Sequence, residues 1–205
     1  MTPQELNAAI RRYLDIVRDP AINQETFQAA LAAVRTAYAA YEAAPTAVYP
    51  SGAFVVQCGQ MVVVDAFSAA DYAVLLPSAL NGRWRAWVGV VAGVHVALLA
   101  WHDTAAPAPS STLHDLMQQT AWLEVGSVPI DTATCAIADR EAYLSLDVDE
   151  AGHQIAGVGA HLCFSNTANA DGDYPVFVQI EDGKVTGVYV EFVPLAEMIE
   201  SRQVS

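Results

Sequence analysis

Acidic, hydroxyl and thiol side chains follow one another in the segment Ile130–Asp139, which reads IDTATCAIAD. A cysteine becomes a nucleophile when a nearby base takes its proton, so Cys135 is a candidate nucleophile, with His161 or His153 as the base. Asp131 is a further catalytic candidate in that interpretation. In the alternative, Asp131 and the two threonines satisfy backbone groups at a turn, and Cys135 fills a small core site. No known catalytic cysteine motif occurs here, which favours the structural interpretation.

A second polar segment reads NADGDYP and places oxygen-bearing side chains at alternate positions, Asn169, Asp171 and Asp173. This spacing is similar to the opening of a calcium-binding loop. Such a loop has its glycine after the third ligand and a glutamate at its end, whereas Gly172 lies between the two aspartates and a strand follows. An Asp-Gly turn before an edge strand that starts near Pro175 explains the same residues without an ion. We predict no metal site.

Histidine and aspartate are adjacent twice, at His102–Asp103 and at His114–Asp115, and both residue types can bind transition metals. A Pro- and Ser-rich loop separates the two pairs, so nothing in the sequence brings them together. The chain also lacks the GxxxxGK[ST], GxGxxG, GxSxG and HExxH patterns of nucleotide-binding proteins, hydrolases and metalloproteases. We predict no bound cofactor.

The N-terminal residues predict two helices joined as a hairpin. The sequence TPQE, which starts at Thr2, is a capping box with proline in the first helical turn. Apolar residues then recur on one face until Arg18–Pro20. Asn23 caps a second helix, which ends before Pro45. Its apolar seam is short, which is typical of contact with a core rather than of a dimerising coil.

From Thr46 onward, short valine-rich runs separated by glycines predict strands. Asp182–Gly183 tolerates positive φ and predicts a two-residue turn between strands at Tyr174–Ile180 and Val185–Phe192. Further strands are predicted at 54–57, 61–64, 84–91, 94–101, 125–130 and 155–164, and short helices at 69–76, at 114–123 and after Val193. The strands at 84–91 and 94–101 are expected to form a hairpin around Ala92–Gly93. We therefore expect an α+β fold, in which a helical hairpin (residues 1–45) packs on a mainly antiparallel, twisted sheet with short flanking helices (residues 46–205).

The composition excludes several classes of function. Hydrophobic residues make up 54% and charged residues 16% of the 205-residue chain, which is typical of a globular protein. Nine Lys and Arg against 23 Asp and Glu give a formal net charge of −14, so a nucleic-acid backbone is repelled.

The most membrane-like stretch, Ala86–Trp101, is shorter than the roughly 20 residues that a spanning helix needs. Three cysteines without CxxC spacing, and an N-terminus unlike a signal peptide, predict a reducing cytoplasm.

The segments Ile130–Asp139 and Ala170–Val178 resemble a bacterial family known as the domain of unknown function 4241 family. Its pattern has an Asp-x-Gly-Thr segment followed by Ile-x-Asp, and later Gly-Asp-Gly-x-Tyr-Pro-Val before a terminal hairpin. The resemblance covers residues 125–192, with a weaker likeness at Met61–Asp65, and Ala133 and Ala170 stand where the family pattern has glycine. It implies no established activity. The residues that it suggests as one spatial group are Asp131, Thr134, Asp139, Asp171, Gly172, Tyr174 and Pro175.

Two hypotheses of function follow. In the first, the chain is a non-enzymatic, immunity-like or regulatory binding protein whose acidic surface recognises a basic protein partner. In the second, it is a small-molecule-binding domain or a hydrolase-like enzyme with its site at the polar, loop-like segments Asp131–Asp139 and Asp171–Tyr174. The ligand-binding residues would then be Asp131, Thr134, Asp139, Asp171 and Tyr174. A third interpretation is assembly of the protein through the helical hairpin or an open sheet edge. The sequence leaves open whether the chain is an enzyme, and it leaves the oligomeric state open.

Overall fold

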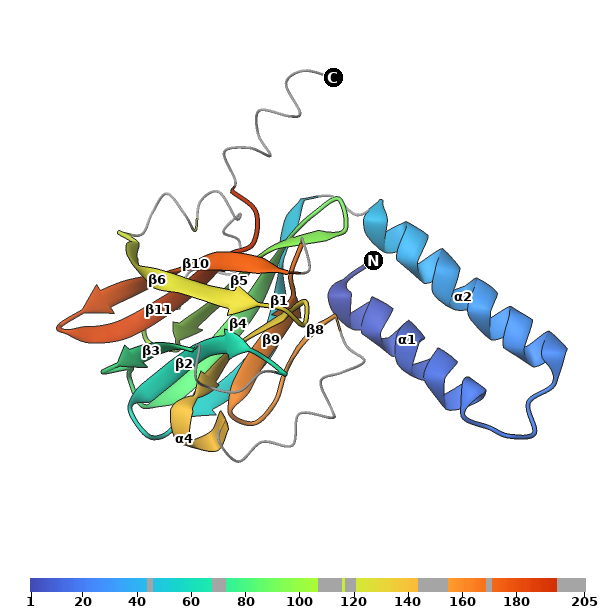
Figure 1. The fold of residues 1–205 in the computed structure, drawn as a ribbon, viewed down its shortest axis with the longest axis horizontal. Helices are drawn as coiled ribbons and strands as arrows, with labels where there is room; N and C mark the ends of the chain where they lie inside the picture. The colour runs from blue at the N-terminus through green and yellow to red at the C-terminus, as the bar shows by residue number, and fades with distance from the viewer. Residues whose placement is uncertain are drawn as a thin grey trace, which may run out of the picture.

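The computed structural model of the chain describes residues 1–43, 46–67, 73–106, 116, 121–143, 155–168 and 171–194. Two long helices are followed by two mainly antiparallel sheets that pack face to face (Figure 1). The predicted α+β class is therefore confirmed. In this part of the chain, no helix is long and apolar enough to span a membrane. The helix predicted after Val193, and six of the ten residues of the one predicted at 114–123, lie outside the described residues; Leu123, at the end of the latter, begins a strand instead.

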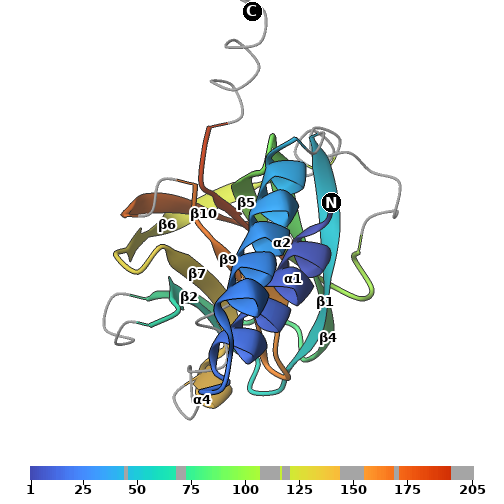
Figure 2. The ribbon, with the colours of Figure 1, turned by 90° about the vertical axis from the view of Figure 1, so that its right-hand side faces the viewer.

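The helices α1 (Pro3–Val17) and α2 (Gln24–Glu42) begin at the caps expected from the sequence. The hydroxyl of Thr2 accepts the N–H of Glu5 at 3.2 Å, and the carboxylate of Glu5 accepts the N–H of Thr2 at 2.7 Å. Asn23 accepts the N–H three residues further along at 2.8 Å. These bonds satisfy N–H groups that have no partner inside a helix, and so they fix both starts. The two helices run antiparallel along one side of the sheets (Figures 1 and 2).

The larger sheet has six strands in the order β1-β4-β5-β11-β10-β6. Their bounds are Ala47–Val56 (β1), Gly82–Val91 (β4), Val94–His102 (β5), Lys184–Glu191 (β11), Gly172–Glu181 (β10) and Leu123–Ile130 (β6). The hairpins β4–β5 and β10–β11 were both expected from the sequence, and both are confirmed. Asp182 and Gly183 have φ of 50° and 73°, because both central residues of this turn type need positive φ.

The smaller sheet has five strands in the order β3-β2-β7-β9-β8. Their bounds are Val74–Pro77 (β3), Gln60–Asp65 (β2), Thr134–Asp139 (β7), Leu162–Asn166 (β9) and Ala156–Val158 (β8), and a short helix, α4 (Arg140–Tyr143), follows β7. β7 is central and all six of its residues are buried. The expectation that Asp131–Asp139 is loop-like is therefore wrong for most of the segment. The small and apolar side chains of β7 fit a strand that lies between β2 and β9, and only residues 131–133 form the loop.

Two other expected elements differ from the structure. The strand predicted at 155–164 is a hairpin, because the chain turns between β8 and β9, where the N–H of Gly159 donates to the carbonyl of Leu162 at 2.9 Å. The described part of the helix predicted at 69–76 is the edge strand β3, whose residues pair with β2. In both cases pairing with a neighbouring strand decided the local structure, because tertiary contacts override local propensity.

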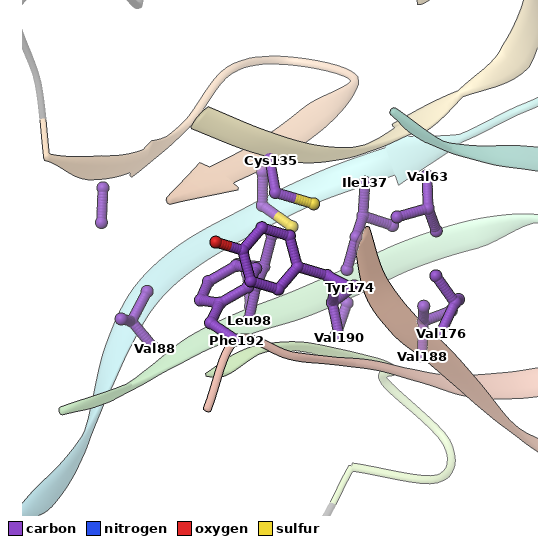
Figure 3. Packing of buried hydrophobic residues seen from close by; sticks show 14 of the residues in the cluster. Val63, Val88, Leu98, Cys135, Ile137, Tyr174, Val176, Val188, Val190 and Phe192 are labelled. Carbon is purple, nitrogen blue, oxygen red and sulfur yellow. The ribbon is translucent and has the colours of Figure 1, made fainter. Parts of the chain in front are cut away.

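The main core lies between the two sheets. Figure 3 shows Val63 and Ile137 of the smaller sheet on one side and Val88, Leu98 and Val190 of the larger sheet on the other. Leu6 of α1 is fully buried in the same cluster. The next residue, Asn7, donates to the carbonyl of Ala156 at 2.6 Å and accepts the N–H of Ile155 at 2.9 Å. The helical hairpin is therefore joined to the sheets by both apolar packing and buried hydrogen bonds.

Candidate functional site

The loop between β6 and β7 is held by the carboxylate of Asp65, the last residue of β2. Its Oδ2 accepts the N–H of Asp131 at 2.8 Å and that of Thr132 at 2.9 Å. Its Oδ1 accepts the hydroxyl of Thr132 and, at 3.1 Å, the N–H of Phe67. Asp65 is only 2% exposed, and a buried carboxylate is stable only when several donors surround it. Three of these four donors belong to Asp131 and Thr132 and fix the start of the loop, and Ala133, which follows, has a positive φ of 59°.

Two carboxyl groups meet at this loop, and their pKa values move in opposite directions. Burial by itself raises the pKa of Asp65, but hydrogen bonds from Thr132, Asp131 and Phe67 outweigh burial and hold that pKa below its usual value. The pKa of Asp131 is raised, first by its side-chain hydrogen bond with Asp65 and then by charge repulsion from Asp65. Asp171 adds further repulsion. Asp65 is therefore the ionised member of the pair, and Asp131 is the member that takes up a proton more readily.

Asp171 reaches the same place from the start of β10, the strand next to β6 in the larger sheet. Gly172 pairs with Ile130 in the register between β10 and β6, so Asp171 and Asp131 lie just beyond this pair at one end of the sheet. We call Asp65, Asp131 and Asp171 the acidic corner. Asp131 and Asp171 come from the two segments that resemble the family, and Asp65 comes from the segment with the weaker likeness. Asp131 and Asp171 are exposed, whereas Asp65 is buried.

Thr134 connects the acidic corner to β9. Its hydroxyl lies 3.5 Å from the carbonyl of Thr132 and 3.4 Å from Oδ1 of Asn166, and both are weak hydrogen bonds. The N–H of Thr167 donates to the carbonyl of Ala133 at 2.9 Å. Thr134 is buried, so the structure gives it a positioning role between two strands.

Tyr174 lies in the core between the sheets. Its ring packs edge-on against Phe192 with centroids 5.3 Å apart, and Figure 3 shows the ring beside Cys135. Its buried hydroxyl has no hydrogen-bond partner among the residues that the structure describes. Gly172 borders this hydroxyl, since a Cβ at that position would lie 3.4 Å from it. Tyr174 therefore packs beneath the start of β10 and does not present its hydroxyl to solvent.

The structure does not support Cys135 as a nucleophile. Cys135 is completely buried, and burial, followed by the nearby Cys163 and Asp65, raises the pKa of its thiol well above the ordinary value. A reactive cysteine needs an accessible thiolate. His161, the expected base, lies at the other end of β7, where its carbonyl accepts the N–H of Asp139 at 2.9 Å. His153 lies outside the described residues. The expected pair of Cys135 and His161 is therefore corrected: Cys135 is a core residue.

Asp139 is also far from the acidic corner, at the opposite end of β7. Its carboxylate accepts the N–H groups of Gln57 at 2.6 Å, Cys58 at 3.0 Å and Ala142 at 3.0 Å. Burial alone raises the pKa of Asp139, but these bonds outweigh burial and lower it. Asp139 fixes the turn between β1 and β2 and caps the start of α4. Of the residues expected as one group, Asp131, Thr134 and Asp171 therefore come together at the start of β7, whereas Asp139 lies at its other end and Tyr174 lies in the core.

Sequence reasoning missed a buried polar chain around His95. Nε2 of His95 lies 2.5 Å from the hydroxyl of Tyr41, and Nδ1 lies 2.7 Å from the hydroxyl of Ser165. The hydroxyl of Ser165 donates to the carbonyl of Asn166 at 3.0 Å. The sequence did contain a signal for this chain of hydrogen bonds: His95 lies inside the valine-rich stretch Ala86–Trp101, and an imidazole buried there requires hydrogen-bond partners.

The other metal-ligand candidates have different partners. Asp103 forms an ion pair with Arg85 at 2.6 Å, and His102 contacts the hydroxyl of Thr104 at 2.8 Å and the carbonyl of Asn81 at 3.1 Å. His114–Asp115 lies outside the described residues. Within those residues, no three His, Cys, Asp or Glu side chains gather in a way that could hold a metal ion.

Comparison of the chain with models of protein families, with curated proteins and with solved structures gave no match in any of the three. The family resemblance described from the two segments stays a prediction.

Proposed function

We propose that this protein is a non-enzymatic binding protein that recognises a basic protein partner through the acidic corner. The observation that carries the proposal is a group of three carboxyl groups without a cation of their own. Among the described residues, the ion pairs join the N-terminus to Glu5 and Arg85 to Asp103, and neither involves the corner.

Electrostatics supports a basic partner. The raised pKa of Asp131 reflects its contact with Asp65 and repulsion from Asp65 and Asp171, so a cationic side chain placed there relieves an existing repulsion. The net charge of −14 extends the attraction beyond the corner, because complementary potentials steer association and suppress partners of the same sign.

The corner is also rigid before a partner arrives. Asp65 holds the backbone N–H groups of Asp131 and Thr132, and a loop that is already ordered loses less conformational entropy on binding. We propose a reducing cytoplasm as the location, supported by three free cysteines, Cys58, Cys135 and Cys163.

One observation favours the second hypothesis, a small-molecule or hydrolase-like site at the same corner. Asp65 and Asp131 form a carboxyl pair whose pKa values are pushed apart, an arrangement that acid–base catalysts use. In such a site Asp131, which is exposed, would exchange protons with a ligand, and Asp65 would hold its charge.

The test is binding of short lysine-rich and arginine-rich peptides, measured by calorimetry at low and moderate salt. The double variant Asp131→Asn/Asp171→Asn should bind roughly tenfold more weakly, since each exposed charge contributes up to about 1 kcal/mol. The matched control Glu181→Gln/Asp182→Asn removes two exposed charges at the other end of β10 and should change affinity much less. Equal losses in the two double variants would show that net charge alone attracts the peptides, and the proposal would then be wrong.

A further inference from the structure

A cavity of about 270 Å³ opens between the end of α2, the start of β5 and the end of β9. Tyr38, Tyr41 and Glu42 line it from the helix, and His95 and Asn166 line it from the two sheets. We infer that this cavity binds an alkylammonium group, either the side chain of a lysine from the basic partner or a free organic amine. The lysine form of the inference rests on the proposed function, whereas the amine form does not.

The helix makes the cavity negative. Glu42 is the last residue of α2, and the last turn contains no basic residue. Carbonyl groups at a helix C-terminus carry a partial negative charge that favours cations. In the described part of the chain no cation lies within ion-pair distance of Glu42. Gly93, which also lines the cavity, lies against this helix end, because a Cβ on it would be 2.5 Å from Cα of Glu42.

Aromatic rings add a second attraction for an ammonium group. Tyr38 is 42% exposed and lies one helical turn before Tyr41. The hydroxyl of Tyr41 is already engaged by His95, so what Tyr41 offers a ligand is its ring. Tyrosine rings attract ammonium groups through their negative faces, and cages of such rings recognise alkylated ammonium.

The remaining lining suits an uncharged stem. Leu6, Val94 and Ile155 supply apolar surface for methylene groups. His95 has both ring nitrogens in hydrogen bonds, and its burial keeps it neutral, so it does not repel a cation. An amine with a short alkyl chain therefore matches the lining better than an anion does.

A hydrogen bond connects the wall of the cavity to the loop that carries Asp131 of the acidic corner. This wall includes Asn166, the last residue of β9, and Thr167, which follows it, and Thr167 donates its N–H to the carbonyl of Ala133 at 2.9 Å. Asp131 lies two residues before Ala133. A basic partner could therefore place one cation at the corner and insert a lysine side chain into the cavity.

The first experiment titrates isotope-labelled protein with n-butylammonium and, as a neutral control of similar shape, 1-butanol, while amide NMR signals of Gly93 and Thr167 are followed. We expect saturable shifts with butylammonium only.

Glu42→Gln and Tyr38→Leu should each weaken butylammonium binding roughly fivefold, because the charge and the ring each contribute a modest attraction. Glu25→Gln, at the opposite end of α2, is the matched control and should bind like the parent protein. Equal shifts with 1-butanol, or equal affinity of Glu42→Gln and Glu25→Gln, would overturn the inference.

The second experiment separates the two sources of the ammonium group and separates this inference from the proposed function. If Glu42→Gln also weakens binding of the lysine-rich peptide, the source is a partner's lysine; if it weakens butylammonium alone, the ligand is a free amine. Asp131→Asn/Asp171→Asn should leave butylammonium binding unchanged. Peptide binding that depends on the acidic corner, without any butylammonium binding, would support the proposed function and overturn this inference. Butylammonium binding without peptide binding would support this inference and overturn the proposed function.

Discussion

The hydroxyl of Tyr41, in the last turn of α2, lies 2.5 Å from Nε2 of His95, near the start of β5. The hydroxyl of Ser165 donates to the carbonyl of Asn166, so it accepts from Nδ1–H of His95, and Nε2 accepts from Tyr41. In this orientation the hydroxyls of Tyr41 and Ser165 and both ring nitrogens of His95 all have a hydrogen-bond partner. The bonds connect the helical hairpin, the larger sheet and the smaller sheet at one buried point.

The protein should become less stable as the pH is lowered, because of His95. Burial lowers the pKa of His95 to about 4 from 6.5. Between these values the unfolded chain binds a proton that the folded protein does not, so the free energy of unfolding decreases as pH falls from 6.5 to 4. The loss should approach about 3 kcal/mol, from about 1.4 kcal/mol per pKa unit. Urea unfolding at several pH values measures it. His95→Gln should remove most of this slope and His102→Gln should keep it; an unchanged slope in His95→Gln would contradict the assignment.

Tyr41→Phe should destabilise the protein by about 1–2 kcal/mol, because it leaves Nε2 of the buried His95 without its donor. Tyr38→Phe, on the exposed side of the same turn, should change the free energy of unfolding by much less. Urea unfolding of the two variants side by side tests the difference, and equal effects would show that the Tyr41 hydroxyl contributes no net stability.

Asp65→Asn should cost about 2–3 kcal/mol, since it weakens charge-assisted hydrogen bonds from the β6–β7 loop in a buried place. The pKa of Asp65 is lowered in the folded protein, so its stabilising effect is present above the ordinary pKa of about 3.9 and is lost as pH falls through the folded value. Asp173→Asn, on an exposed neighbour, is the control. Thermal unfolding at neutral pH should separate the two variants clearly.

The three cysteines should differ in reactivity with a thiol reagent. Cys135 and Cys163 are fully buried, and burial raises the pKa of both thiols, whereas Cys58 is partly exposed. Cys58 should therefore react first in the native protein, and the other two should react only as the protein unfolds. Denatured protein, in which all three thiols react, is the control. Fast labelling of native Cys135 would revive it as a candidate nucleophile.

Asn7→Ala should loosen the contact between α1 and β8 and cost about 2–3 kcal/mol, because it leaves the carbonyl of Ala156 and the N–H of Ile155 without partners. Gln4→Ala removes an exposed bond from the same helix to the carbonyl of Pro50 and should cost less. Hydrogen exchange of the α1 amides should increase in Asn7→Ala only. Unchanged exchange would show that Leu6 packing alone holds the hairpin.

Local patterns predicted those parts of the fold that depend on neighbouring residues. The capping box at Thr2, the turn at Asp182–Gly183 and the hairpin around Ala92–Gly93 each need only a few adjacent residue types, and all three occur as expected. β7 was misjudged, because Thr134 and Asp139 at its ends look like loop residues until strands on both sides bury them.

The candidate site was only partly predictable. Asp131 and Asp171 were identified as neighbours through their motifs, but Asp65 was not assigned a role, because the loop that it holds lies 66 residues further along the chain. His95 has partners 54 and 70 residues away, and no local pattern can indicate such a pair.

The sequence by itself determined the charge of −14, the helix caps, the two hairpins and the α+β class, because these depend on composition or on residues close along the chain. Only the tertiary structure decided which polar groups meet. Asp65 meets Asp131, and Tyr41 meets His95, because distant strands and a helix pack together and every buried polar group must then find a partner among the atoms that packing brings within reach.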